Sequence, residues 1–210
     1  MKSFYKVLTF FLFFITISFH LSVLGQQQKM ALSRTTVKKT FYKIKGKTIS
    51  DLILQIRKKN IQKALPHTIS AASVQANLTI NNIVLPLPVQ KKCSLKKQHL
   101  QWSLTIQYLL PLWEDKLHSS KNLQKKWNSY YARLLIHENG HRDHFLQAAL
   151  SIQKYLDNLP PGQAKGVKTN CLFFVSQVKN KIVDIFKKFE KKNLLYDNST
   201  RHGLLQGAIL

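Results

Sequence analysis

Three residues in the middle of the chain have the types and the spacing of a metal site. His137, Glu138 and His141 form the pattern His-Glu-x-x-His, and residues four apart lie on one face of an α-helix. The two imidazoles can therefore bind one cation, while the carboxylate beside them acts on a water molecule. The spacing predicts the zinc-binding helix of a metallopeptidase.

The flanking residues predict one long helix that buries this trio. Apolar and site residues recur at steps of three or four, namely Trp127, Tyr131, Leu134, Glu138, His141, Phe145, Ala148, Ile152 and Tyr155. Burying two imidazoles and a carboxylate is costly unless a divalent cation satisfies them. Gly140 costs about 1 kcal/mol relative to alanine inside a helix, which predicts the close approach of another group. A simple packing notch is the alternative.

A third ligand is needed, because catalytic zinc usually has three protein ligands and this helix supplies two. His202 is the first choice, since imidazole suits zinc and Gly203 permits a close approach of the backbone. The alternatives are His144 on the same helix, and Asp184, Glu190 and Asp197 further along the chain. Lysines near Asp184 and Glu190 favour surface ion pairs for those two residues. His144 is expected to lie beside the ligands or in the cleft wall.

The elements before this helix are predicted to be mainly strands. Apolar residues alternate in two runs between residues 68 and 112, Val74, Ala76, Leu78, Ile80 and then Leu100, Trp102, Leu104, Ile106, Tyr108. Pro111 is expected to end the last strand. A shorter alternation predicts a strand over 40–45, and Thr48 or Ser50 followed by Asp51 indicates the start of a helix.

A second long helix is expected to begin near residues 168–171. Its apolar stripe is Val175, Val178, Ile182, Ile185, Phe186 and Phe189, which is typical of a core-facing helix. The stretch 196–208 has turn residues and no helical period, so an irregular tail is expected there. These patterns predict an α+β fold in which a small, mostly antiparallel sheet packs on long helices, including the one with the histidines.

The N-terminal residues 1–25 have the pattern of a secretory signal peptide, with early lysines, an apolar run and a small-residue cleavage site. A retained membrane anchor is the alternative. Cleavage leaves about 185 residues, enough for one domain over 36–210. We therefore expect an exported protein, periplasmic or secreted, in which Cys93 and Cys171 form a disulfide.

The charge is extreme, with 33 Lys and Arg against nine Asp and Glu and a formal net charge of +24. An anionic envelope surface or a nucleic acid could attract such a chain. The lysines are scattered and the arginines are few, which favours a solvated surface, so no nucleic-acid partner is expected. Membrane contact is expected only through an uncleaved signal segment.

Four stretches together resemble one bacterial family, at residues 41–48, 110–113, 137–141 and 196–208. The family is described as predicted secreted zinc-dependent proteases and is a domain of unknown function in the zincin-like clan. The resemblance covers roughly residues 36–210. It implies a zincin-like fold and a Zn²⁺ ion at the site.

The sequence thus leads to the hypothesis of an exported zinc metallopeptidase that cleaves a protein or peptide substrate. Glu138 is expected to be the general base that takes a proton from water. Tyr196 or Arg201 could stabilise the oxyanion. The alternative is a non-catalytic cationic protein with a structural zinc site, which would bind the envelope or a nucleic acid.

Overall fold

The structure is a computed structural model, and it describes residues 25–26, 28–59, 71–81, 92–93, 101–159, 164–165 and 168–210. Its main sheet has three strands in the order β1-β4-β2, where β1 is Thr35–Ile44, β2 is Ser73–Ile80 and β4 is Trp102–Trp113. β1 pairs with β4 in parallel and β2 pairs with β4 antiparallel. The sheet is therefore mixed rather than mostly antiparallel. Alternation predicts strands but says nothing about which neighbours they have or in which direction those neighbours run.

The central strand β4 places alternate side chains in the core. Trp102, Leu104, Ile106, Tyr108 and Leu110 are all buried, as the period of two predicts. The sequence predicted that this strand ends at Pro111, but β4 continues to Trp113. The ladder to β2 ends at the Ser73 and Leu109 pair, so Pro111 lies where only β1 runs alongside. Its missing N–H therefore costs no bond to β2.

The short helix α2 (Ile49–Lys58) begins as its sequence predicts. The Thr48 side chain accepts a hydrogen bond from the Asp51 backbone N–H at 3.1 Å, and the Asp51 carboxylate accepts from the Thr48 N–H at 3.0 Å. This reciprocal capping box satisfies two N–H groups that the first turn leaves without helical partners. Leu52 and Ile56 are buried and attach the helix to the core.

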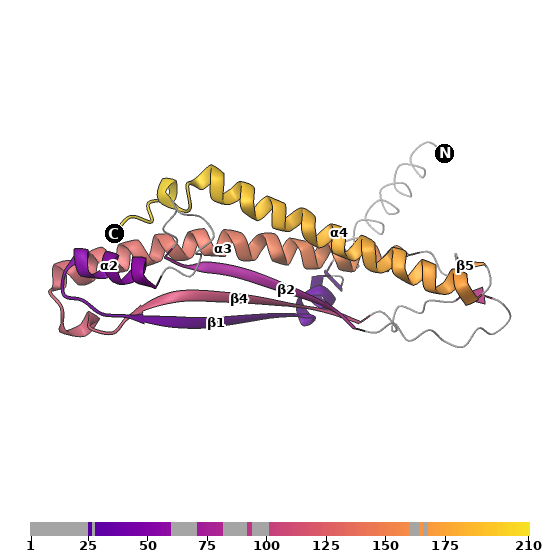
Figure 1. The fold of residues 1–210 in the computed structure, drawn as a ribbon, viewed down its shortest axis with the longest axis horizontal. Coiled ribbons are helices and arrows are strands. Elements are labelled where there is room, and N and C mark those ends of the chain that lie inside the picture. The colour runs from indigo at the N-terminus through magenta and orange to yellow at the C-terminus, as the bar shows by residue number, and fades with distance from the viewer. Residues whose placement is uncertain are drawn as a thin grey trace, which may run out of the picture.

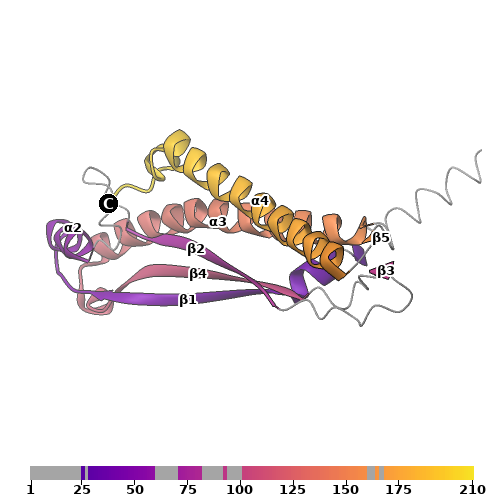
Figure 2. The ribbon, with the colours of Figure 1, turned by 45° about the vertical axis from the view of Figure 1, so that its right-hand side comes forward.

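Two long helices form the other layers. α3 (Lys121–Asp157) lies against the sheet, and α4 (Lys168–Thr200) packs on the opposite side of α3 (Figures 1 and 2). The predicted stripes are buried in both helices except for Tyr131, Tyr155 and Ile185, which are half-buried. Trp127 of α3 contacts Trp113 of β4 with ring centroids 5.6 Å apart. Because α3 has the sheet on one side and α4 on the other, the residues in its middle that face these layers are shielded from water.

The C-terminal stretch differs from the expected irregular tail. Residues 196–200 form the last turns of α4, and only then does the chain reverse. The reversal uses three consecutive residues with positive φ, Arg201 at 49°, His202 at 52° and Gly203 at 84°. The 3₁₀ helix η3 (Leu204–Gln206) follows and returns toward α3. Contacts with α3 hold these residues in a helix, although their sequence has no apolar period.

Among the described residues, no helix has the length and apolar character needed to span a bilayer. Residues 1–24 of the proposed signal segment lie outside the described residues. β3 (Lys92–Cys93) and β5 (Ala164–Lys165) form a separate antiparallel pair near the start of α4. β3, which contains Cys93, contacts α4, the helix that contains Cys171. Both side chains lie outside the described part of the chain, so the disulfide stays a prediction.

Candidate metal centre

The predicted trio lies on the face of α3 that is turned toward the core and α4. The exposed fractions of His137, Glu138 and His141 are 3%, 2% and 6%. The sequence predicted this burial correctly, because the three residues continue the apolar stripe of the helix. Groups of this polarity are not left buried without partners.

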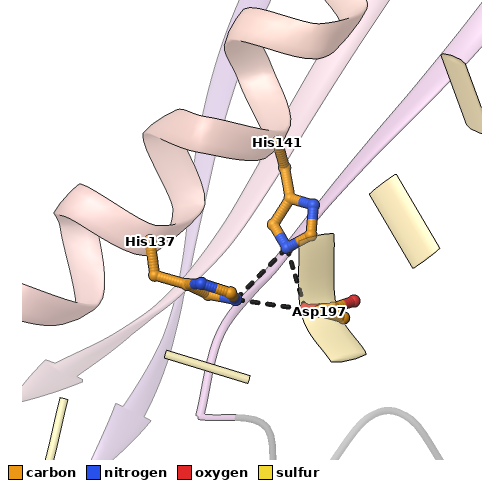
Figure 3. Close-up of side chains that lie close together, drawn as sticks. All are labelled: His137, His141 and Asp197. Carbon is orange, nitrogen blue, oxygen red and sulfur yellow. Dashed lines mark hydrogen bonds and ion pairs between the residues drawn. The ribbon is translucent and has the colours of Figure 1, made fainter. Parts of the chain in front are cut away.

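The two histidines meet a carboxylate from α4. His137 Nε2 and His141 Nε2 each lie 3.1 Å from Asp197 Oδ1, and the two Nε2 atoms lie 3.2 Å apart (Figure 3). Among the described residues, these three form the group of side chains that could hold a metal ion. Asp197 was one of the sequence-based alternatives for the third ligand.

Each histidine has a second partner on its other ring nitrogen. His137 Nδ1 lies 2.9 Å from Gln206 Oε1, and His141 Nδ1 lies 3.0 Å from Asn193 Oδ1. An amide oxygen can only accept a hydrogen bond, so each Nδ1 carries the proton. The Nε2 atom of a neutral ring then presents a lone pair to its neighbours.

This donor set fits a divalent cation. Two Nε2 lone pairs and a carboxylate oxygen converge, and without a positive charge between them these three acceptors would repel one another. Nitrogen and oxygen ligands about 2.0–2.1 Å from a tetrahedral zinc ion lie about 3.3 Å from each other. The observed separations of 3.1 to 3.2 Å are close to that value.

The charges of the group reinforce one another. Without a bound cation, a proton on Nε2 takes the place of the metal and is donated to Asp197 Oδ1. Burial tends to raise the pKa of Asp197, but such hydrogen bonds from His137 and His141 outweigh it and hold that pKa well below its usual range. Burial tends to lower the pKa of His141, but the hydrogen bond and the charge of Asp197 outweigh it and raise that pKa. Asp197 is therefore an anion that attracts positive charge to the two Nε2 atoms.

Glu138 is close to these ligands but does not bond to them. Burial raises the pKa of its carboxyl group to about 7, against the lowering effect of His141 and His137. Its Oε2 atom is buried and has no hydrogen-bond partner. A carboxyl group with a pKa near neutrality can both take up and release a proton at pH 7.

A cavity of about 160 Å³ opens over the group. It is lined by the start of β2 and by both long helices, through Ala72, Ser73, Val74, His137, Glu138, His141, Asn193, Leu194 and Asp197. The Nδ2 atom of Asn193 is a second buried atom without a partner in this lining. A ligand in the cavity would therefore meet the three converging acceptors, a carboxyl oxygen and an amide.

Gly140 permits the close approach that its position in the helix predicts. A Cβ atom at this position would lie 2.7 Å from Tyr196 Cε1, and closer still to the Cζ and hydroxyl of the same ring. The Tyr196 ring stacks on His137, with centroids 5.1 Å apart and planes 11° apart. Tyr196 thus lies directly on the backbone of α3, one residue before Asp197.

The other predicted site residues lie around this group. His202 Nδ1 is 3.4 Å from Asp197 Oδ1, so His202 contacts the carboxylate, although it is outside the group of three. His144 bonds Asn193 rather than the converging atoms. Arg201 is exposed, and the Tyr196 hydroxyl accepts a hydrogen bond from Gln206. The oxyanion roles suggested for Tyr196 and Arg201 stay predictions.

Two of the predicted alternatives for the third ligand lie away from the centre, and two residues that bond the histidines were not predicted. Asp184 and Glu190 are exposed on α4 and lie outside the group. Asn193 and Gln206 were not anticipated. Asn193 lies one helical turn before Asp197, a spacing that could have indicated it once the stretch was recognised as helix.

Residues 39–203 match the model of one protein family, described as a bacterial protein of unknown function (DUF922). The chain belongs to this family. The DUF922 match begins within β1, includes the rest of the main sheet, α3 with its histidines and α4 with Asp197, and ends at Gly203. No curated protein and no solved structure matches the chain.

Proposed function

We propose that this DUF922 protein is a zinc-dependent hydrolase, and more specifically a peptidase of the zincin type. One observation carries the proposal. His137 Nε2, His141 Nε2 and Asp197 Oδ1 converge within 3.2 Å of one another beside a buried glutamate whose Oε2 has no partner. A merely structural zinc site is usually closed by four protein ligands and needs no such base.

In this proposal His137, His141 and Asp197 hold Zn²⁺. The ion supplies the Lewis acidity that lowers the pKa of water and polarises a carbonyl group. Three protein ligands leave one position open for water or substrate, as in catalytic sites. His202, beside Asp197, is the remaining candidate for a ligand or for a hydrogen bond to that carboxylate.

Glu138 is the proton carrier. Its buried carboxylate takes a proton from the attacking water and returns it to the leaving amine. Burial both raises its pKa to about 7 and excludes competing solvent, which suits transfer in each direction near neutral pH. In this proposal the substrate binds in the cavity that is lined by the start of β2 and by Leu194 of α4.

The test compares zinc content and hydrolysis in matched variants. Asp197→Asn should lose most of the bound zinc, while Asp184→Asn, an exposed aspartate on the same helix, should keep it. Glu138→Gln should keep zinc near one per chain and lose hydrolysis of a peptide mixture followed by mass spectrometry. A base in general acid and base catalysis contributes roughly 10²–10⁴-fold to rate.

Two outcomes would refute the proposal. One is a wild-type protein that takes up no zinc after loading, which would leave a cationic binding protein. The other is hydrolysis that is equally fast in Glu138→Gln. Retention of zinc in Asp197→Asn together with its loss in His202→Ala would instead make His202 the third ligand.

A further inference from the structure

We infer that Asn193 and Gln206 are positioning residues that hold His141 and His137 in the tautomer that binds a cation through Nε2. The inference rests on the proposed function, because it concerns the same metal centre. It adds two amide side chains, both on the C-terminal part of the chain, to a site whose recognisable motif lies on α3. Neither amide need contact the ion.

Gln206 is fixed at both ends of its amide. Its Oε1 lies 2.9 Å from His137 Nδ1, and its Nε2 donates to the Tyr196 hydroxyl at 2.8 Å. Tyr196 is itself held between Gly140 and the His137 ring. In this arrangement the nitrogen end of the amide bonds the phenol and the oxygen end faces the imidazole. His137 must then carry its proton on Nδ1 and present the lone pair of Nε2 to the centre.

Asn193 does the same for the second histidine. Its Oδ1 lies 3.0 Å from His141 Nδ1 and 2.9 Å from His144 Nδ1. Two imidazole Nδ1 atoms thus lie within hydrogen-bond distance of one amide oxygen, which can accept from both. Asn193 is only 8% exposed, so water competes little for this oxygen. The arrangement also gives His144 a role, since it helps to orient Asn193 without reaching the centre.

The backbone is shaped to bring Gln206 to the site. The left-handed residues Arg201, His202 and Gly203 reverse the chain after α4, and the reversal is closed by a bond from the Ala208 N–H to the Gly203 carbonyl at 3.1 Å. A Cβ atom on Gly203 would lie 3.2 Å from His137 Cβ. Two non-glycine residues with positive φ are unusual, and such strain persists where the surroundings impose it. Here the turn places Gln206 beside Nδ1 of the His137 ring, the nitrogen that does not face the converging group.

The primary test is the zinc dissociation constant, measured by competition with a chromophoric chelator on the purified protein. Gln206→Ala and Asn193→Ala should each weaken zinc binding by about 10–100-fold, as loss of such outer partners does. Gln206→Glu keeps an acceptor for the His137 N–H and should recover most of that loss. Gln153→Ala is the matched control, because Gln153 is a buried amide on α3 that bonds Asp157 instead of a histidine.

A second readout separates positioning from general destabilisation. In the zinc-loaded protein with ¹⁵N-labelled histidine, the Nδ1–H signals of His137 and His141 should be visible and slow to exchange with water. Gln206→Ala should speed the exchange at His137 alone, and Asn193→Ala should do so at His141 and His144. A general loss of stability would instead speed the Nδ1–H exchange of His137, His141 and His144 together.

Failure of the inference can be told from failure of the proposed function. Zinc binding of wild-type strength in both alanine variants, with unchanged Nδ1–H exchange, overturns the inference and leaves the metal centre standing. Weakened zinc binding in Gln153→Ala equal to that in Gln206→Ala also overturns it. Absence of zinc from the wild-type protein overturns the proposed function, and the inference with it.

Discussion

The contact between Gly140 and Tyr196 makes one substitution a sensitive test of the site. In an exposed helix, Gly→Ala is stabilising by up to about 1 kcal/mol. At position 140 the new Cβ would lie 2.7 Å from Tyr196 Cε1 and closer to two other ring atoms. The ring must therefore move by about 1 Å to reach an ordinary contact distance.

Tyr196 has little freedom to yield. Its ring stacks on His137, and it meets His141 and His144 edge-on with centroids 5.1 and 5.4 Å away. The end of α4 must shift instead, and Asp197 shifts with it. Overpacking of this kind costs about 1–3 kcal/mol, and the helix gain of up to about 1 kcal/mol offsets part or all of that cost. We expect Gly140→Ala to lower the free energy of unfolding by about 0–2 kcal/mol and to weaken zinc binding at least tenfold.

The assay is urea denaturation together with a zinc competition titration, in two backgrounds. In Tyr196→Ala protein the obstructing ring is absent, so Gly140→Ala should there stabilise by up to about 1 kcal/mol. A change from destabilisation in the wild-type background to stabilisation in the Tyr196→Ala background would show that contact with the Tyr196 ring causes the cost of Gly140→Ala. If Gly140→Ala stabilises the wild-type protein by the same amount and leaves zinc binding unchanged, the reasoning is wrong.

Three further predictions concern separate features. Thr48→Ala should cost about 1 kcal/mol of stability through loss of the capping box, measured by urea denaturation, and should leave zinc content unchanged. Phe145→Ala should cost about 3–5 kcal/mol, because Phe145 is buried and stacks on Phe186 between the long helices. In chelator-treated protein, the raised pKa of Glu138 means that the folded state binds its proton more tightly than the unfolded state, so stability should fall as pH rises from about 4.5 to 7. Between pH 5 and 8 the free energy of unfolding of the wild-type protein should fall by about 2–3 kcal/mol more than that of Glu138→Gln. An equal fall in both proteins would contradict the burial of the Glu138 carboxyl group.

The sequence predicted correctly those features that depend on residues within a single helix or strand. The helix cap at Thr48, one of the two predicted candidates, the alternation of β4 and the spacing of His137 and His141 each depend on neighbours within a few residues. The burial of Glu138 followed from its place in an apolar stripe. Gly140 was correctly predicted to permit a close approach, although the identity of the approaching group was not.

The features that sequence could not supply depend on long-range contacts. Asp197 lies 56 residues after His141, in a polar stretch whose helical state depends on contact with α3. That is why Asp197 was only an alternative to His202 before the end of α4 was known. The parallel pairing of β1 with β4 is a choice between sheet neighbours that alternation does not encode. Asn193 and Gln206 act through hydrogen bonds that follow from the meeting of α3, α4 and η3.

The positions of the tryptophans allow two events to be observed separately. All three, Trp102, Trp113 and Trp127, are buried and belong to the sheet or to α3, while α4 contributes Asp197 to the centre and contains no tryptophan. Intrinsic fluorescence should therefore report on melting of the sheet and α3, whereas the absorption of a substituted cobalt ion would report on the docking of α4. A cobalt signal lost at a lower urea concentration than the fluorescence would mean that α4 detaches first, as a separate cooperative unit. Coincident loss would mean that the whole chain unfolds in one step.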